Sequence, residues 1–204
     1  ITAVGQDALA NNTTASNNTG IGKSALKENT TGIKNVAVGA LALDANTTGS
    51  SNTGIGSEAL TANTSGGQNT GIGRLALFST TTGGSNTGIG SQALLDNTTG
   101  ALNTAVGAES LANNISGGTN VSVGYQAMLA NTTGDNNTAL GTKSLFSNTT
   151  ADNNVAVGRS ALEQNTTGEK NVAVGGYALD SNTTASFNTA VGYDALENNT
   201  VGFY

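Results

Sequence analysis

Hydrophobic and polar residues recur along this chain with a period of 17, twelve times without an insertion or deletion. The consensus unit is N-T-A-V-G-x-x-A-L-x-x-N-T-T-G-x-x, and its positions are numbered 1 to 17 from the first Asn. A fixed period indicates stacked structural repeats. The twelve units begin at Ile1, Asn18, Asn35, Asn52, Asn69, Asn86, Asn103, Asn120, Asn137, Asn154, Asn171 and Asn188.

Alternation at the start of each unit predicts a short strand. Position 2 is Thr or Val, position 3 is Ala, Gly or Ser, and position 4 is always Val, Ile or Leu. β-Branched residues on one side and very small residues on the other give the period of two that a strand requires. We expect the core to contain the aliphatic residues of positions 2 and 4, the residues of position 8 and the leucines of position 9.

Two segments of each unit predict corners. Position 5 is Gly in all twelve units, as expected where φ is positive or a neighbouring chain leaves no room for a Cβ atom. Gly107→Val should therefore be destabilising, whereas Glu109→Val should be mild. Positions 12 to 15 have the consensus N-T-T-G, a turn sequence that favours left-handed backbone: Asn is at position 12 in eleven units, with Thr80 the exception, and Gly is at position 15 in nine. Positions 6 to 11 fit either a second strand or one helical turn.

Charged and aromatic residues mark the expected outer surface. All 20 charged and all 8 aromatic residues fall at positions 6, 7, 10, 11, 16 or 17, a sorting that a disordered chain would not show. Units of 17 residues are too short for a helix pair, and their Thr, Asn and Gly are poor helix formers. The pattern predicts an all-β fold: a parallel β-solenoid, or β-roll, of twelve coils in which residues 1–204 form one repeat array. Asn ladders should follow its axis at positions 1 and 12.

The amino-acid composition excludes most catalytic mechanisms. The chain has no His and no Cys, so it lacks an imidazole base, a thiolate nucleophile and nitrogen or sulfur ligands for metals. A net charge of −6 argues against nucleic acid as a partner. No apolar run approaches the roughly 20 residues that span a bilayer. We expect neither enzymatic activity nor a cofactor, a metal site or membrane insertion.

Acidic residues suggest two further kinds of site, a glycosidase pair and a calcium site. Glu163 and Asp180, or Asp180 and Asp194, lie on successive coils, and paired carboxylates are what a glycosidase needs. Nothing in the pattern would raise one pKa, so solvated charges are the favoured interpretation. Asp135 and Asp152 are isolated at position 16, whereas a calcium-binding β-roll needs a column of Asp in its turns.

The repeat unit resembles two groups of known proteins. Asn154-Val155-Ala156-Val157-Gly158 is similar to the S-V-A-I-G strand in the head repeats of trimeric autotransporter adhesins. Residues 188–200 resemble the N-T-A-V-G-Y-Q-A-L repeat arrays of phage tail fibres and bacterial surface proteins. The adhesin resemblance implies a left-handed β-roll with three chains around one axis, although the adhesin heads have a shorter period. A thin core and the small residues of position 3 also favour a homotrimer, with a single-chain fibre as the alternative.

These features predict a structural shaft or filament of an extracellular fibre, a surface adhesin or a phage tail fibre, located on a cell surface or virion. Because the chain begins and ends in phase with its repeat, we expect it to be a segment of a longer one. The alternative is a glycan- or ice-binding β-solenoid. Exposed Tyr125, Tyr177 and Tyr193 would contact the glycan, and the Thr columns at positions 13 and 14 would contact ice.

The pattern N-x-T/S recurs at position 12 and marks candidate sites for covalent N-linked glycans. Neighbouring sites lie one coil apart, so a ladder-forming turn Asn is the favoured interpretation. The candidates are Asn12, Asn29, Asn46, Asn63, Asn97, Asn114, Asn131, Asn148, Asn165 and Asn182.

Overall fold

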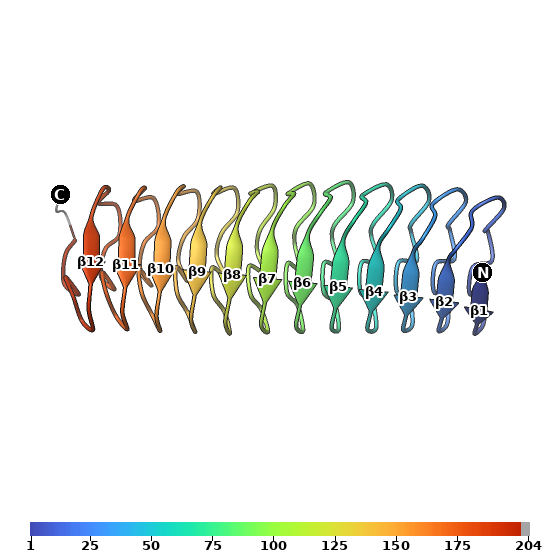
Figure 1. Cartoon of the computed structure of the whole chain (residues 1–204), viewed down its shortest axis with the longest axis horizontal. Helices are drawn as coiled ribbons and strands as arrows, with labels where there is room; N and C mark the ends of the chain where they lie inside the picture. The colour runs from blue at the N-terminus through green and yellow to red at the C-terminus, as the bar shows by residue number, and fades with distance from the viewer. Residues whose placement is uncertain (201–204) are drawn as a thin grey trace.

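The computed structural model describes residues 1–200 and shows one parallel β-solenoid (Figure 1). Its strands stack in sequence order into a single sheet, and each residue pairs with the equivalent residue of the next coil, as Val155 does with Val172. The predicted fold class and period are confirmed. The strands are β1 (Thr2–Val4), β2 (Thr19–Ile21), β3 (Val36–Val38), β4 (Thr53–Ile55), β5 (Thr70–Ile72), β6 (Thr87–Ile89), β7 (Thr104–Val106), β8 (Val121–Val123), β9 (Thr138–Leu140), β10 (Val155–Val157), β11 (Val172–Val174) and β12 (Thr189–Val191).

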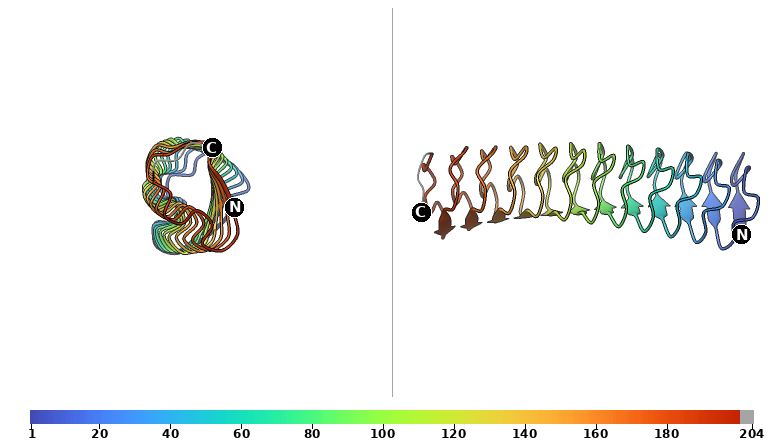
Figure 2. Two further views of the ribbon diagram at one scale, coloured as in Figure 1. Left: turned by 90° about the vertical axis from the view of Figure 1, so that its left-hand side faces the viewer. Right: turned by 90° about the horizontal axis from the view of Figure 1, so that it is seen from above.

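The coils form a straight, slightly twisted rod. Seen along the axis they nearly superimpose, each rotated a little from the one before (Figure 2). Eleven steps at the ordinary sheet spacing of about 4.8 Å place β12 roughly 53 Å from β1. Within the part of the chain that the structure describes, no helix is long and apolar enough to cross a membrane.

Backbone hydrogen bonds join neighbouring coils well beyond the strands. The N–H of Leu26 donates to the carbonyl of Ala42 at 3.0 Å, and the N–H of Glu28 donates to the carbonyl of Asp44 at 3.0 Å. Such bonds recur around the circumference, so each coil satisfies much of its backbone through its two neighbours. Every coil is therefore a structural unit whose contacts are confined to adjacent coils.

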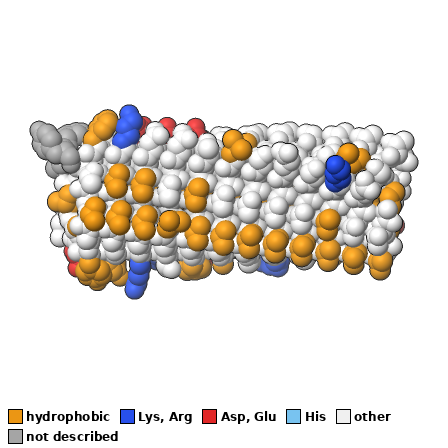
Figure 3. Space-filling view, viewed as in Figure 1, with side chains coloured by type: hydrophobic (Ala, Val, Ile, Leu, Met, Phe, Trp, Pro, Cys, Tyr) orange, Lys and Arg blue, Asp and Glu red, His pale blue; other side chains and the backbone are white. Residues whose placement is uncertain are grey.

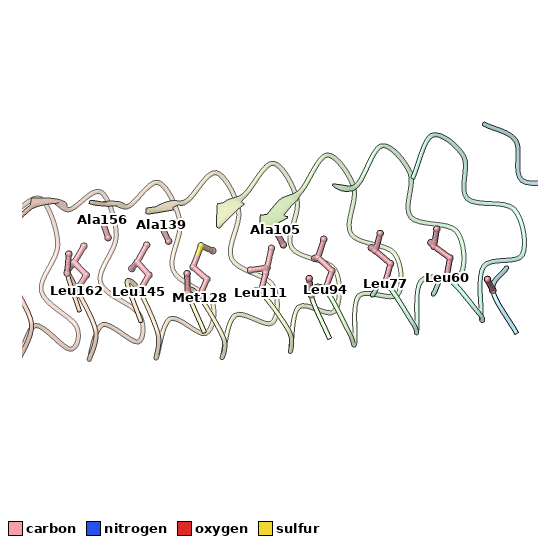
Figure 4. Packing of buried hydrophobic residues seen from close by; sticks show 14 of the residues in the cluster. Leu60, Leu77, Leu94, Ala105, Leu111, Met128, Ala139, Leu145, Ala156 and Leu162 are labelled. Carbon is pink, nitrogen blue, oxygen red and sulfur yellow. The ribbon is translucent and has the colours of Figure 1, made fainter. Parts of the chain in front are cut away.

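The interior consists of a column of leucines facing a column of small strand residues. Leucines at position 9, from Leu26 to Leu179, are fully buried, as are most residues of positions 3 and 8. The strand residues Ala105, Ala139 and Ala156 lie against the leucine column (Figure 4). The predicted core role of positions 8 and 9 is confirmed.

The side of each strand that faces the core is the opposite of the side predicted from the sequence. Ala37, at position 3, is 0% exposed, whereas Ile55, at position 4, is 38% exposed. A Cβ atom on Gly20 would lie 3.2 Å from Cγ of Leu9, so the leucines leave room for only Ala, Gly or Ser beneath the strand. The alternation along the strand is correctly predicted, but the predicted burial of positions 2 and 4 is wrong. The small residues of position 3 were expected to face outward toward a partner chain, and that expectation is wrong as well.

The position 5 glycines form a tight corner, as predicted. Their φ angles lie between 128° and 139°. A Cβ atom on Gly107 would lie 2.5 Å from the carbonyl oxygen of Gly124 in the next coil. Positive φ and close approach of the adjacent backbone therefore both require glycine.

Left-handed residues other than glycine recur at positions 7, 9 and 17. In one coil they are Glu109 (φ 56°), Leu111 (φ 55°) and Thr119 (φ 59°). Positions 6 to 11 therefore form a series of turns, neither a second strand nor a helical turn.

At the second corner, positive φ falls at position 17 and not at position 15. A Cβ atom on Gly117, at position 15, would lie 2.5 Å from Oδ1 of Asn114. Ala15, Ala151 and Ala185 occupy this position in other coils, so the site is crowded without requiring glycine.

Candidate functional site

Two ladders of buried asparagines run along the rod, as the sequence predicts. In the position 12 ladder, Nδ2 of Asn46 donates to Oδ1 of Asn29 at 2.8 Å and to the carbonyl of Gly49 at 3.0 Å. In the position 1 ladder, the backbone N–H of Asn35 donates to Oδ1 of Asn18 at 2.9 Å, and its Nδ2 donates to the same Gly49 carbonyl at 2.8 Å. Each amide thus ties two coils together and closes a turn.

The candidate glycosylation asparagines are the members of the position 12 ladder. All except the partly buried Asn12 are fully buried. Nδ2, the atom that would carry a sugar, is already in use: in Asn131 it donates to Oδ1 of Asn114 at 2.8 Å and to the carbonyl of Gly134 at 3.1 Å. A glycosylated Nδ2 keeps only one hydrogen, so a glycan on a folded coil would break at least one of these bonds and would have to fit where the side chain is fully buried. N-glycosylation therefore stays a prediction of the sequence, and it would have to precede folding.

The threonine hydroxyls of position 13 are also engaged between coils. Oγ1 of Thr47 donates to the carbonyl of Thr64 at 3.0 Å, and Oγ1 of Thr98 donates to the carbonyl of Ile115 at 3.0 Å. Strand threonines at position 2, such as Thr87, make no side-chain hydrogen bond to protein within residues 1–200. Threonine hydroxyls without a protein partner therefore lie on the sheet as well as at position 14 of the turn, where Thr48 and Thr99 are exposed.

The outer face of the sheet carries an uninterrupted aliphatic row. Position 4 side chains such as Ile21, Ile72 and Leu140 are exposed along the strands, and Figure 3 shows this row crossing the rod. No charged residue occurs at positions 2 or 4 in any coil. The sheet face is therefore flat, regular and uncharged, with methyl groups and free hydroxyls side by side.

A shallow groove of about 450 Å³ lies on a different side of the rod, across the coils that carry β8 to β11. Its residues come from positions 6, 7 and 10, which are surface positions as predicted. It is lined by Tyr125, Thr142, Lys143, Arg159, Ser160, Glu163 and Tyr177.

Aromatic and cationic groups are stacked at this groove. The guanidinium carbon of Arg159 lies 5.5 Å from the centroid of the Tyr177 ring. The ring of Tyr193 meets Tyr177 edge to face, with centroids 5.9 Å apart and an interplanar angle of 81°. The structure thus places Tyr125 and Tyr177 in one groove, three coils apart, and Tyr193 beside Tyr177. Arg159 and Lys143 were not predicted as site residues, although positions 6 and 7 of adjacent coils are neighbouring columns.

Both cations of the groove are without an acidic partner in the described part of the chain. Nζ of Lys143 lies 5.4 Å from the centroid of the Phe146 ring, and neither Lys143 nor Arg159 forms an ion pair within residues 1–200. The one ion pair there joins Lys27 and Glu28 at 3.3 Å, far along the rod. The groove's cationic donors are therefore free for a ligand.

The carboxylates weighed for hydrolysis belong to a column with a shared environment. Burial raises the pKa of Asp180, and the neighbouring Glu163 and Glu197 raise it further. Burial also raises the pKa of Asp44, at the same position 10 in the other half of the rod. Since the shift recurs wherever Asp occupies this position, the turn environment explains it without a catalytic pair.

The Asp residues of position 16 bind backbone. Oδ1 of Asp135 accepts the N–H of Gly118 at 2.6 Å, and Oδ1 of Asp152 accepts the N–H of Asp135 at 2.7 Å. In residues 1–200 no group of three or more acidic side chains is arranged to hold a metal ion.

Comparisons of the chain with protein-family models, curated proteins and solved structures found no match.

Proposed function

We propose that the chain is a structural shaft or filament segment of an extracellular fibre, such as a surface adhesin or phage tail fibre. The observation that supports this best is the unbroken register: all twelve strands pair in sequence, and no described coil carries an inserted loop. A rod of this kind gains length in fixed increments, because each added coil repeats the contacts of the one before.

The interior chemistry supports rigidity. Two Asn ladders, the leucine column and the backbone bonds all run along the axis, so bending the rod would strain several parallel rows at once. Charged side chains stay on the outside, where a net charge of −6 favours solubility. These properties suit a spacer that holds another domain away from a surface.

Localisation tests this function directly. An antibody raised against the purified 204-residue array should decorate thin fibres on intact, unpermeabilised cells or virions of the source in immunogold electron microscopy. Labelling confined to the cell interior would contradict the proposal.

Three copies of the chain are the proposed assembly of such a fibre. The small residues of position 3 lie in the core, so the surface left for self-association is the aliphatic sheet face. Light scattering should give a mass of three times 20.0 kDa, and Ile89→Lys on that face should lower it to one chain. A folded particle of 20.0 kDa would instead favour the single-chain fibre.

Ice binding is the second candidate function, and the flat sheet face is the observation that favours it. Threonine hydroxyls and aliphatic methyls repeat about every 4.8 Å along the rod and about 6.6 Å along each strand. A regular array of this kind can order water at its surface. Thermal hysteresis that Ile89→Lys abolishes and Ser91→Lys on another face leaves intact would support it, whereas no hysteresis would exclude it.

A further inference from the structure

We propose that the groove between Tyr125 and Tyr177 binds an acidic saccharide. This saccharide groove departs from the repeat around it, since the rod otherwise presents similar coils along its length. The equivalent positions 6 and 7 of an earlier coil hold Arg74 and Leu75, with no tyrosine beside them. A local departure from a regular surface marks a place where side chains do more than maintain the fold.

Two tyrosines form the platforms of the groove. Tyr125 is 49% exposed, and Tyr177 lies three coils farther along, about 14 Å away at the ordinary sheet spacing. The face of a sugar ring is covered by C–H groups, which pack on the negatively charged face of an aromatic ring. Tyr125 is the open platform, and Tyr177 carries Arg159 over its ring at the other end, a separation that suits a short oligosaccharide lying along the rod axis.

The ring of Tyr177 is held in place before any ligand binds. Tyr193 meets it in an edge-to-face contact, and Arg159 lies over its ring. Gly176 makes room for this arrangement, because a Cβ atom there would lie 3.3 Å from two carbons of the Tyr193 ring. A platform fixed in this way loses little conformational entropy on binding.

The charges of the groove select an acidic sugar. Lys143 and Arg159 outnumber Glu163, and no cation here is neutralised by an ion pair within residues 1–200, in a chain whose net charge is −6. The Arg159 guanidinium lies over the Tyr177 ring and forms no ion pair within residues 1–200, so its N–H groups are available for a carboxylate, which a guanidinium binds in bidentate geometry. Glu163 and the hydroxyl of Thr142 are placed to bond sugar hydroxyl groups.

The shape of the groove favours a saccharide over an apolar ligand. Its volume of about 450 Å³ is within the usual range for ligand sites, yet it is shallow and open along the rod. Five of its seven lining residues carry polar or charged groups, yet more of the exposed lining is apolar than polar. A ligand with polar edges and apolar faces fits these walls.

Titration calorimetry of the whole chain with an oligogalacturonate tests the proposal, with a maltooligosaccharide of equal length as the neutral comparison. Tyr177→Leu and Arg159→Gln should each weaken oligogalacturonate binding about tenfold. Both replacements are compatible with the fold, because Leu75 and Gln6 occupy the same positions in other coils. Arg74→Gln is the matched control: it removes the same charge at position 6 in a coil without tyrosines and should leave affinity unchanged.

Added salt should weaken oligogalacturonate binding to the unaltered chain more than binding to Arg159→Gln. Absence of oligogalacturonate binding, equal affinity for the neutral sugar, or an equal loss in Arg74→Gln would each overturn the proposal. None of these outcomes touches the shaft function, which depends on the register of the coils.

Discussion

Oδ1 of Asn63 is buried without a hydrogen-bond partner because the next coil carries Thr80 in place of the asparagine that would donate to it. In most of the ladder, as between Asn114 and Asn131, an amide fills this place at 2.8 Å, although Oδ1 of Asn182 is also without a partner in the described part of the chain. Thr80→Asn should restore the missing donor and raise the free energy of unfolding by about 1 to 3 kcal/mol, the usual cost of an unsatisfied buried polar group. Denaturant unfolding measures the change.

The reverse substitution is the control. Asn131→Thr introduces the same defect into an intact part of the ladder and should lower stability by a similar amount. If Thr80→Asn is neutral while Asn131→Thr is destabilising, the ladder oxygen of Asn63 has found another partner and the explanation is wrong.

The corner at Gly107 should not accept a side chain. Gly107→Val combines φ of 128° with a Cβ atom that would lie 2.5 Å from the Gly124 carbonyl oxygen, and should cost at least about 2 kcal/mol. The neighbouring exposed Ala108→Val should change stability by less than about 0.5 kcal/mol. Equal melting temperatures for the two variants would contradict the corner geometry.

Replacing a left-handed leucine by glycine should relieve backbone strain and stabilise the rod. Leu102 has φ of 62° and is 60% exposed, so its side chain contributes little burial to offset the unfavourable conformation. Leu102→Gly should raise the free energy of unfolding by up to about 1 kcal/mol, after the entropy cost of glycine is subtracted. Ala101→Gly, without positive φ, should lower it by about 0.5 to 1 kcal/mol. Thermal melting of the pair tests this difference in sign.

The raised pKa of Asp180 predicts a specific pH dependence. A carboxyl whose pKa is higher in the folded state stabilises the fold below its ordinary pKa of 3.8, and this contribution is lost as the pH rises through the folded-state pKa. At pH 7, Asp180→Asn should therefore melt at a higher temperature than the unaltered chain, and the gain should vanish near pH 3.8.

Asp194→Asn removes the same charge from an exposed side chain and serves as the control for Asp180→Asn. It should have little effect at either pH. If it stabilises as much as Asp180→Asn does, the cause is the overall net charge and not the burial of Asp180.

The period, the corners at position 5, the ladders and the outer surface could be predicted from sequence, because each rests on a residue type repeated in one environment. The inward side of the strand could not be assigned from hydrophobicity, which favoured Ile55 over Gly54. Size was the better signal: a column restricted to Ala, Gly and Ser is what a closely packed interior requires, whereas an open surface would admit larger residues.

The turns at positions 7 and 9 could not be predicted because their backbone opposes local preference. Leu111 is left-handed in the structure only because its side chain enters the core and its N–H reaches the carbonyl of Ala127. The same effect changes the expectation for Glu109→Val: with φ of 56°, a β-branched residue there would be strained, so the substitution should not be mild.

The groove was partly predicted through its tyrosines, but its cations become relevant only when adjacent coils are superimposed.

Deletion of one whole coil tests most directly the claim that this is a rod of independent 17-residue units. Removing residues 103–119 keeps the register of every remaining coil, so small-angle scattering should show a folded rod shortened by about 4.8 Å. Removing residues 103–110 places the leucine column opposite a turn and should abolish the cooperative melting of the rod. Equal tolerance of both deletions, or a full-coil deletion that unfolds the chain, would contradict the account.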